Sequence, residues 1–313
     1  MRYRQLGEDG PQVSVVGLGC NNFGGRIDRD GTRAVVAAAF DVGVNLFDTA
    51  DVYGNRGGSE TLLGEALVGR RDRVVLATKF GNPMSGDDED APRGSRAYIR
   101  SAIEASLRRL QTDWIDLYQY HRPDGVTPVE ETLGALNDLV DEGKVRFIGS
   151  SNFSAEQVEE ADRIARQRGW ARFVSAQNEY SLLEREAENE LLPVCERLGI
   201  GVLPYFPLAD GLLTGKYRRG KEAPEGSRLS GQPERLKDQA FDRIEALERY
   251  AEERGRRLLD VAIGGLAAQP AISSVIAGAT KPEQVRENAA AGEWEPSEED
   301  VAALRATLNG AGG

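Results

Sequence analysis

Four side chains in this sequence have the types and spacing needed to transfer a proton to a carbonyl oxygen. Asp48 ends a short apolar run, and Tyr53 comes five residues after it. Lys79 and His121 end later runs of the same kind. An aspartate at the end of a buried strand needs a cationic partner, because an unpaired buried charge costs on the order of several kcal/mol. We expect Lys79 to be that partner.

Together the four side chains suit general acid catalysis. An unperturbed tyrosine has a pKa of about 10, and a neighbouring ammonium such as that of Lys79 stabilises its phenolate by about 1.4 kcal/mol per unit of pKa. His121 can donate a hydrogen bond to the substrate oxygen or relay the proton. Because this set contains no nucleophile and no metal site, a hydride from a nicotinamide cofactor is the natural attacking group.

Each residue also has an ordinary structural interpretation. Lys79 alone could be solvated at a strand end, and Asp48 could cap a turn. His121 is the one histidine in the chain and could make a structural hydrogen bond, while Tyr53 could simply pack. The convergence of all four on one site favours the catalytic interpretation.

The elements that must position these residues alternate along the chain. Apolar segments of strand length lie near residues 12–20, 44–49, 73–80, 115–121, 145–150, 173–177, 201–206 and 272–277. Helical sequence follows each of them. In chain order it lies near residues 31–42, 59–68 and 96–110, from 127 onward, from 154 onward, near 184–198, 241–254 and 258–268, and in a last helix from about 282. Eight such units predict an α/β fold, a closed (β/α)8 TIM barrel. Without an internal repeat or a linker, residues 1–313 are expected to form a single domain.

Two helix starts carry specific signals. Thr127 to Glu130 reads as a capping box with Pro128 at the first helical position, and Ser154 to Gln157 reads as a second capping box. The sequence therefore predicts the N-termini of these two helices most sharply.

The barrel makes a further prediction about polar residues at strand ends. Catalytic residues of this fold gather at the C-terminal ends of the strands. In strand order, from the second strand to the seventh, the polar residues at these ends are Asp48, Lys79, His121, Ser151 with Asn152, Gln177 and Tyr205. We therefore expect them to meet at one mouth.

Composition and charge narrow the class of protein. The chain is 40% hydrophobic and 29% charged, which suits a globular protein with a large core. Its net charge of −12 argues against binding to nucleic acid or to an anionic membrane surface. No apolar run reaches membrane-spanning length, and the N-terminus lacks the apolar core of a signal peptide. Cys20 and Cys195 form neither a metal motif nor a disulfide framework, so a cytoplasmic location is expected.

The order of short motifs resembles that of an aldo-keto reductase along nearly the whole chain. The matching segments are residues 16–19 (Val-Gly-Leu-Gly), 45–50 (Asn-Leu-Phe-Asp-Thr-Ala) with Tyr53, 76–79 (Leu-Ala-Thr-Lys), 116–121 (Asp-Leu-Tyr-Gln-Tyr-His), 148–153 (Ile-Gly-Ser-Ser-Asn-Phe), 177–178, 207–209, 211–217, 278–280 and 287–288. The resemblance implies a barrel plugged by a short N-terminal β-hairpin, here within residues 2–13. It also implies that Tyr53 is the general acid of a tetrad completed by Asp48, Lys79 and His121.

The same resemblance implies how a cofactor would bind. Ser151, Asn152 and Gln177 would hold the nicotinamide carboxamide, and Tyr205 would stack on the ring. In this family the loop at residues 211–216 folds over the cofactor, and Lys216 and Arg228 are candidates for contacting its phosphates. The other residues implied to bind the cofactor are Pro207, Leu208, Gly278, Thr280, Lys281, Gln284, Glu287 and Asn288.

The adenosine end departs from the best-known branch of the family. That branch has a Lys-Ser pair and a later arginine around the 2′-phosphate, where this chain has Gly278, Ala279 and Gln284. The arrangement is similar to the branch with the potassium-channel β subunits and many bacterial reductases. Thr280, Lys281 and Gln284 could still hold a phosphate at a helix N-terminus, where backbone N–H groups favour anions. NADPH is therefore expected in preference to NADH.

The expected function is NADPH-dependent reduction of aldehydes or ketones, with two alternatives left open. One is a cofactor-binding regulatory subunit with incidental turnover, and the other is a sugar or alcohol dehydrogenase running in the oxidative direction. A barrel hydrolase or lyase would need a metal cluster or paired carboxylates at the mouth, and the sequence offers neither. The pocket loops at residues 20–30, 81–95 and 208–240 vary freely in such a family. The sequence therefore identifies neither the small-molecule substrate nor an oligomeric state.

Overall fold

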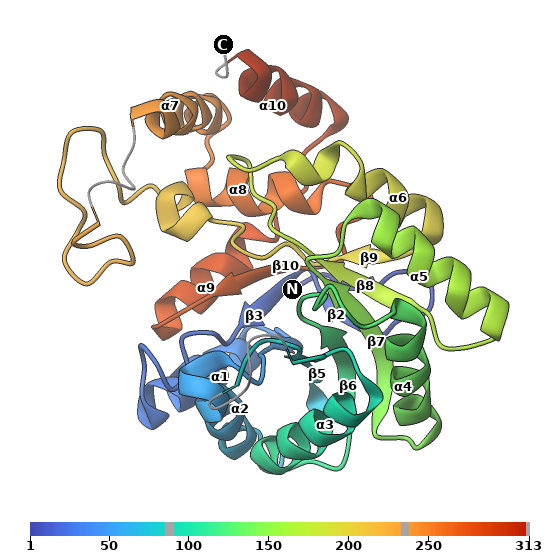
Figure 1. Ribbon diagram of the computed structural model, residues 1–313. Helices are drawn as coiled ribbons and strands as arrows, with labels where there is room; N and C mark the ends of the chain where they lie inside the picture. Colours follow the sequence, from blue (N-terminus) through green and yellow to red (C-terminus); the bar gives the residue numbers. More distant parts are fainter. Residues whose placement is uncertain (85–90, 233–237, 311–313) are drawn as a thin grey trace.

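A ring of eight parallel strands, surrounded by helices, forms the predicted (β/α)8 barrel (Figure 1). The computed structural model describes residues 1–84, 91–232 and 238–310. The strands of the ring are β3 (Val16–Gly19), β4 (Leu46–Asp48), β5 (Val75–Phe80), β6 (Ile115–Tyr120), β7 (Val145–Ser151), β8 (Phe173–Gln177), β9 (Gly201–Val202) and β10 (Val275–Gly278).

The helices pack outside the strands and alternate with them along the chain. They are α1 (Arg29–Asp41), α2 (Tyr53–Ala66), α3 (Arg96–Leu110), α4 (Val129–Asp141), α5 (Ala155–Arg168), α6 (Leu191–Leu198), α7 (Asp238–Glu253), α8 (Leu258–Ala267), α9 (Pro282–Ala291) and α10 (Glu298–Gly310), with the short 3₁₀ helices η1 (Arg71–Arg73), η2 (Glu186–Glu188) and η3 (Ala209–Thr214). In the described part of the chain, no helix is both long enough and apolar enough to cross a membrane.

The sheet closes between its two edge strands. Its order is β10-β3-β4-β5-β6-β7-β8-β9, so β9 and β10 form the edges. The Val202 amide donates to the Ala271 carbonyl at 2.7 Å, and the Ser273 amide donates back to the Val202 carbonyl at 3.1 Å. A further bond of 3.3 Å joins the Ile276 amide to the Pro204 carbonyl. These bonds tie β9 to the segment that enters β10 and complete the barrel.

An antiparallel hairpin closes the N-terminal end of the barrel. Its strands are β1 (Tyr3–Gln5) and β2 (Gln12–Ser14). Leu6 and Val13 of this hairpin are fully buried and belong to the same apolar cluster as side chains of β4, β5, β6, β8 and β10. Burying a leucine or valine in this way contributes about 1.5–3 kcal/mol. The predicted N-terminal hairpin is therefore present and plugs the barrel.

The central strands are rigidly enclosed. All six residues of β5 and all six of β6 are buried, as expected for strands with one face inside the barrel and the other under helices. The ring of Phe80 stacks on those of Tyr118 and Tyr120, with centroids 4.8 and 5.0 Å away. The residues at the C-terminal ends of β5 and β6 are therefore held in fixed positions.

Of the two predicted capping boxes, one is confirmed and one is wrong. The Ser154 side chain accepts from the Gln157 amide and the Gln157 side chain accepts from the Ser154 amide, which is the reciprocal capping box. Before α4, however, Pro128 is the N-cap residue and makes no side-chain cap. The Thr127 hydroxyl instead donates to an Asp124 carboxylate oxygen at 2.7 Å. Because this hydrogen bond holds the Thr127 side chain in the turn formed by Asp124, the predicted capping box does not form.

Several elements differ from their predicted ranges. The strand predicted within residues 12–20 is divided into β2 and β3, the helix predicted near 59–68 begins at Tyr53 as α2, and the helix predicted near 184–198 is the short η2 followed by α6. The seventh strand was predicted over residues 201–206, but β9 ends at Val202, shortly before Pro204, which has no N–H to donate to a ladder. The single helix predicted from about residue 282 is two helices, α9 and α10. Gly292 and Pro296 lie between them, and both residue types interrupt a helix.

Candidate active site

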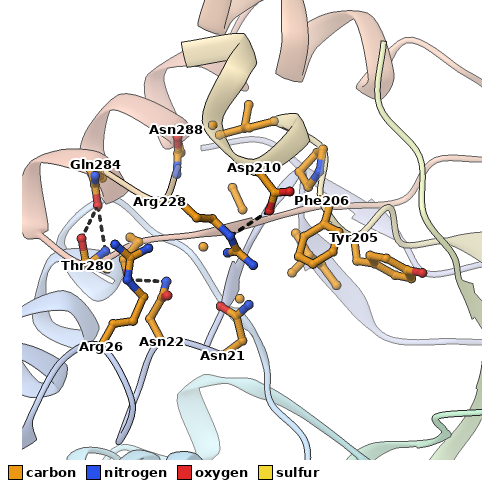
Figure 2. Close-up of a pocket in the computed structure, with 18 of the residues that line it drawn as sticks. Asn21, Asn22, Arg26, Tyr205, Phe206, Asp210, Arg228, Thr280, Gln284 and Asn288 are labelled. Carbon is orange, nitrogen blue, oxygen red and sulfur yellow. Dashed lines mark hydrogen bonds and ion pairs between the residues drawn. The ribbon is translucent and has the colours of Figure 1, made fainter. Parts of the chain in front are cut away.

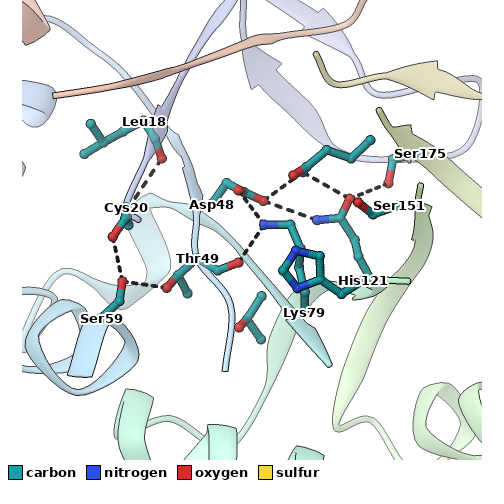
Figure 3. A network of polar contacts seen from close by, with 12 residues as sticks. Leu18, Cys20, Asp48, Thr49, Ser59, Lys79, His121, Ser151 and Ser175 are labelled. Carbon is teal, nitrogen blue, oxygen red and sulfur yellow. Dashed lines mark hydrogen bonds and ion pairs between the residues drawn. The ribbon is translucent and has the colours of Figure 1, made fainter. Parts of the chain in front are cut away.

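A buried ion pair links the ends of β4 and β5. The Lys79 ammonium lies 2.7 Å from one carboxylate oxygen of Asp48 and donates a second hydrogen bond of 2.8 Å to the Thr49 carbonyl (Figure 3). Lys79 is fully buried and Asp48 is 3% exposed. The cationic partner expected for Asp48 is therefore Lys79.

The second carboxylate oxygen of Asp48 is also satisfied. It accepts from the side-chain amides of Gln177 at 2.9 Å and Gln119 at 3.3 Å. Burial by itself lowers the pKa of Lys79, but the Asp48 carboxylate and the Tyr53 hydroxyl outweigh it, and the pKa is raised above its ordinary value. A charged, hydrogen-bonded lysine is thus fixed under the mouth of the barrel.

Tyr53 is placed beside this lysine by an unusual turn. The four residues after it, Gly54 to Gly57, all have positive φ angles, so the chain turns sharply before α2 becomes regular. The Lys79 ammonium lies 5.0 Å from the centre of the Tyr53 ring. Burial raises the pKa of Tyr53 above 10, and Lys79 reduces this rise without reversing it. The expected stabilisation of a phenolate is therefore only partial, and Tyr53 remains a protonated phenol at neutral pH.

His121 approaches the same tyrosine from the end of β6. The two rings meet edge to face, with centroids 5.7 Å apart and planes at 86°. Burial, together with the charges of Lys79 and Arg122, holds the pKa of His121 well below its ordinary value. The imidazole is therefore neutral, and its Nδ1 atom lies 2.8 Å from the side-chain nitrogen of Asn82.

These residues form one end of a cavity of about 640 Å³ (Figure 2 shows part of its wall). The cavity extends from Asp48, Tyr53 and His121 to the start of α9. Its lining includes these predicted cofactor-binding residues: Asn152, Gln177, Tyr205, Pro207, Leu208, Lys216, Arg228, Gly278, Thr280, Lys281, Gln284, Glu287 and Asn288. Lys79 and Ser151 are buried beneath its wall.

Asn152 organises the part of the cavity next to His121. Its φ angle is 58°, a left-handed conformation that asparagine tolerates better than most residues. Its amide nitrogen donates to the His121 carbonyl at 2.9 Å and to the Ser151 hydroxyl at 3.1 Å. Its amide oxygen accepts from the Tyr205 hydroxyl at 2.8 Å. Asn152 thus joins the predicted carboxamide site to the backbone of a tetrad residue.

Arg228 and Lys216 lie on the segment that follows β9. The Arg228 guanidinium is 2.8 Å from an Asp210 carboxylate oxygen and lies over the Phe206 ring, 5.0 Å from its centre (Figure 2). Lys216 is exposed, with its ammonium 5.2 Å from the centre of the Tyr217 ring. Of these two predicted phosphate contacts, Arg228 has an acidic partner in the protein itself.

The start of α9 is arranged around Gln284. Both the amide and the hydroxyl of Thr280 donate to the Gln284 side-chain oxygen, at 2.7 and 3.1 Å (Figure 2). Lys281 is the exposed N-cap residue of α9 and makes no side-chain cap. Thr280 and Gln284, both predicted to hold a phosphate, are therefore bonded to each other. Pro282 has no N–H, so the N–H groups that remain at the helix start, where they favour an anion, begin with that of Glu283.

The cavity wall also contains residues that the sequence did not single out. Within the loop that follows β3, these are Asn21, Asn22 and Arg26. Arg26 donates to the Gly226 carbonyl at 3.3 Å, which connects this loop to the segment that carries Arg228. Their position directly after a barrel strand was the one available signal, since such loops build the mouth of this fold.

Comparison with known proteins agrees with this geometry. A model of the aldo/keto reductase family matches residues 15–309. The probable voltage-gated potassium channel subunit beta of Oryza sativa subsp. japonica is 38% identical, over 92% of this chain and 90% of its own length. The uncharacterized oxidoreductase YrpG of Bacillus subtilis (strain 168) is 38% identical, over 100% and 98%. The probable aldo-keto reductase 1 of Glycine max is 36% identical, over 95% and 86%. The chain belongs to the aldo/keto reductase family, and its general class is that of an oxidoreductase.

Proposed function

We propose that this protein reduces aldehydes or ketones to alcohols with NADPH, and that it does so in the cytoplasm. The observation that carries the proposal is the geometry around Tyr53, whose ring lies 5.0 Å from the Lys79 ammonium of the buried Asp48–Lys79 ion pair and meets the His121 ring edge to face. Burial raises the pKa of Tyr53, so its phenol holds a proton at neutral pH. A group that must give up a proton in the reaction has to hold one at working pH.

The protein's own residues would act on the carbonyl oxygen. When bound, a nicotinamide cofactor supplies the hydride that reaches the carbonyl carbon. The Tyr53 hydroxyl donates its proton to the oxygen, and Lys79, held in place by Asp48, stabilises the phenolate left behind. His121 donates a hydrogen bond to the same oxygen. General acid catalysis of this kind contributes about 10²–10⁴-fold to rate.

The polar groups along the cavity fit an extended dinucleotide. The volume of about 640 Å³ lies within the range of roughly 300–1,000 Å³ usual for ligand pockets. Ser151, Asn152 and Gln177 would bind the carboxamide at the tetrad end, and Tyr205 would flank the ring. Lys216, with Arg228, Pro207 and Leu208, would hold the pyrophosphate from the segment after β9. At the adenosine end, the residues proposed to act are Gly278, Thr280, Lys281, Gln284, Glu287 and Asn288.

NADPH is proposed over NADH on electrostatic grounds. Lys281 places a positive charge beside the N–H groups at the start of α9. A 2′-phosphate would gain from both, whereas the ribose hydroxyl of NADH would gain little, since charge-assisted hydrogen bonds are about twice as strong as neutral ones.

A regulatory cofactor-binding subunit is the second candidate. It is supported by the 38% identity to a rice protein named as a probable potassium channel subunit. The two candidates differ in turnover: an enzyme should reduce some carbonyl compound at an ordinary rate of about 1–10³ per second.

The decisive experiment is a panel of aldehydes, ketones and sugars assayed for oxidation of NADPH and, separately, of NADH, together with a panel of alcohols and sugars assayed for reduction of NADP⁺ and NAD⁺. The proposal expects at least one substrate at an ordinary rate, with NADPH preferred. Very slow turnover across the whole panel, with cofactor retained through purification, would favour the regulatory subunit. Turnover only of alcohols or sugars with the oxidised cofactor would establish the oxidative direction instead.

A further inference from the structure

We infer that Asn82 is a positioning residue that keeps the proton of His121 on Nε2. The inference rests on the proposed function for its catalytic meaning, but the protonation pattern itself belongs to the protein alone. Nothing in the sequence pattern of the tetrad pointed to Asn82, which lies in the loop after β5.

With the Asn82 amide turned so that its nitrogen faces the ring, as in this structure, the contact between the two side chains allows one arrangement of hydrogens. The Asn82 amide nitrogen lies 2.8 Å from Nδ1 of His121. An amide nitrogen carries two hydrogens and accepts none, so Nδ1 must be the acceptor. A neutral imidazole that accepts at one nitrogen carries its proton on the other. The proton of His121 is therefore on Nε2.

Among the described residues, a glycine shapes the start of the loop that presents Asn82, and two hydrogen bonds hold it. Gly81 has a φ angle of 109°, and a Cβ atom there would come within 2.6 Å of the Tyr120 ring, so only glycine fits. The Arg93 guanidinium donates to the Gly81 carbonyl at 3.0 Å. The Tyr98 hydroxyl donates to the Asn82 backbone carbonyl at 3.4 Å. These contacts hold the start of the loop so that the Asn82 amide reaches His121.

The proton position decides what His121 can do at the reacting oxygen. His121 lines the cavity, and Nε2 is the ring nitrogen that Asn82 leaves available to a ligand. With its proton there, His121 donates to a carbonyl oxygen. With the proton on Nδ1, the lone pair of Nε2 would face the lone pairs of that oxygen and repel it. Asn82 therefore selects the tautomer that can assist Tyr53.

His121 is the one histidine in the chain, which makes the test direct. In the full-length protein labelled with ¹⁵N, the imidazole gives a single pair of nitrogen signals, and protonated and unprotonated nitrogens resonate far apart. The inference predicts an unprotonated Nδ1 and a protonated Nε2 at pH 7. A wild-type spectrum with a protonated Nδ1 would overturn it.

Two variants at position 82 extend the test. In Asn82→Asp the carboxylate can only accept, so Nδ1 should become protonated. In Asn82→Ala the preference for the tautomer with its proton on Nε2 is lost, and both nitrogen signals should shift toward values averaged over the two tautomers. Asn189→Asp is the matched control, because it makes the same change at an exposed asparagine outside the cavity wall, and its spectrum should match wild type. Unchanged imidazole signals in both Asn82 variants would overturn the inference.

The activity readout separates this inference from the proposed function. At pH 9 the imidazole of Asn82→Asp should be neutral with its proton on Nδ1, and kcat/KM for a carbonyl substrate should fall by about 10²-fold, the loss typical of one catalytic hydrogen-bond donor. If the wild-type protein turns over a carbonyl substrate and Asn82→Asp is equally active, the role of Asn82 is overturned and the proposed function stands. The predicted spectra in a protein that reduces no carbonyl would support the tautomer and refute the proposed function.

Discussion

Replacing Asp51 with asparagine should stabilise the protein, and more strongly as pH rises. Asp51 is 2% exposed, and its Oδ1 atom has no hydrogen-bond partner among the described residues. Burial, and then the negative charge of Glu60, raise the pKa of Asp51 from 3.8 to about 8. Glu60 is itself held by the Thr78 hydroxyl and the Arg109 guanidinium, each at 2.6 Å.

The sign follows from proton binding. Between about pH 4 and pH 8 the folded protein keeps the proton on Asp51 while the unfolded chain has released it, so stability falls as pH rises through this window. Each pH unit within the window costs about 1.4 kcal/mol, or on the order of 4 kcal/mol between pH 5 and pH 8. Asparagine resembles the protonated acid but does not ionise, so it removes this cost.

Urea denaturation at pH 5 and pH 8 measures the effect. The free energy of unfolding of Asp51→Asn, relative to wild type, should rise by on the order of 4 kcal/mol between the two pH values. Asp113→Asn is the control, because Asp113 is an exposed aspartate, and its difference from wild type should stay constant. A gain in Asp51→Asn that is equal at both pH values would refute the reasoning.

Two further substitutions test the ion pair and the adenosine end. Asp48→Ala leaves the Lys79 ammonium buried without its partner and should lower the free energy of unfolding by about 3–5 kcal/mol. The double variant Asp48→Ala with Lys79→Met should recover most of that loss. Equal losses in the single and double variants, measured by urea denaturation, would argue against the pairing. Lys281→Ala should weaken NADPH binding about tenfold, the loss of one charged hydrogen bond, and leave NADH nearly unchanged in a fluorescence titration. Equal weakening of both cofactors would move Lys281 to the shared pyrophosphate or to folding.

The fold was predictable because its signals are local. Each barrel strand is a short apolar run followed by helical sequence, and the Ser154 box depends on residues three positions apart. The Thr127 box failed because Asp124, outside the four-residue motif, competes for the threonine hydroxyl. Local patterns predict an element well until a neighbouring side chain offers a better partner.

Part of the candidate site follows from one rule and part does not. Strand ends converge at the mouth of a barrel, and this was enough to bring Asp48 and Lys79 together. The partner of Asn82 lies 39 positions away along the chain, and the groups that shift the pKa of Asp51 come from other elements. Such contacts depend on loop conformation and packing depth, which residue spacing does not encode. Burial likewise reversed the expected direction for Tyr53, since desolvation outweighs the charge of Lys79.

Proton donation by Tyr53 is the central step of the proposed reaction. The test is a single-turnover reduction of an aldehyde, with enzyme in excess and saturating NADPH, comparing wild type with Tyr53→Phe. The substitution removes the hydroxyl and keeps the ring, so cofactor affinity should change by no more than about twofold while the hydride-transfer rate falls by about 10²–10⁴-fold. A Tyr53→Phe rate within a few-fold of wild type, with normal cofactor binding, would show that Tyr53 is not the proton donor.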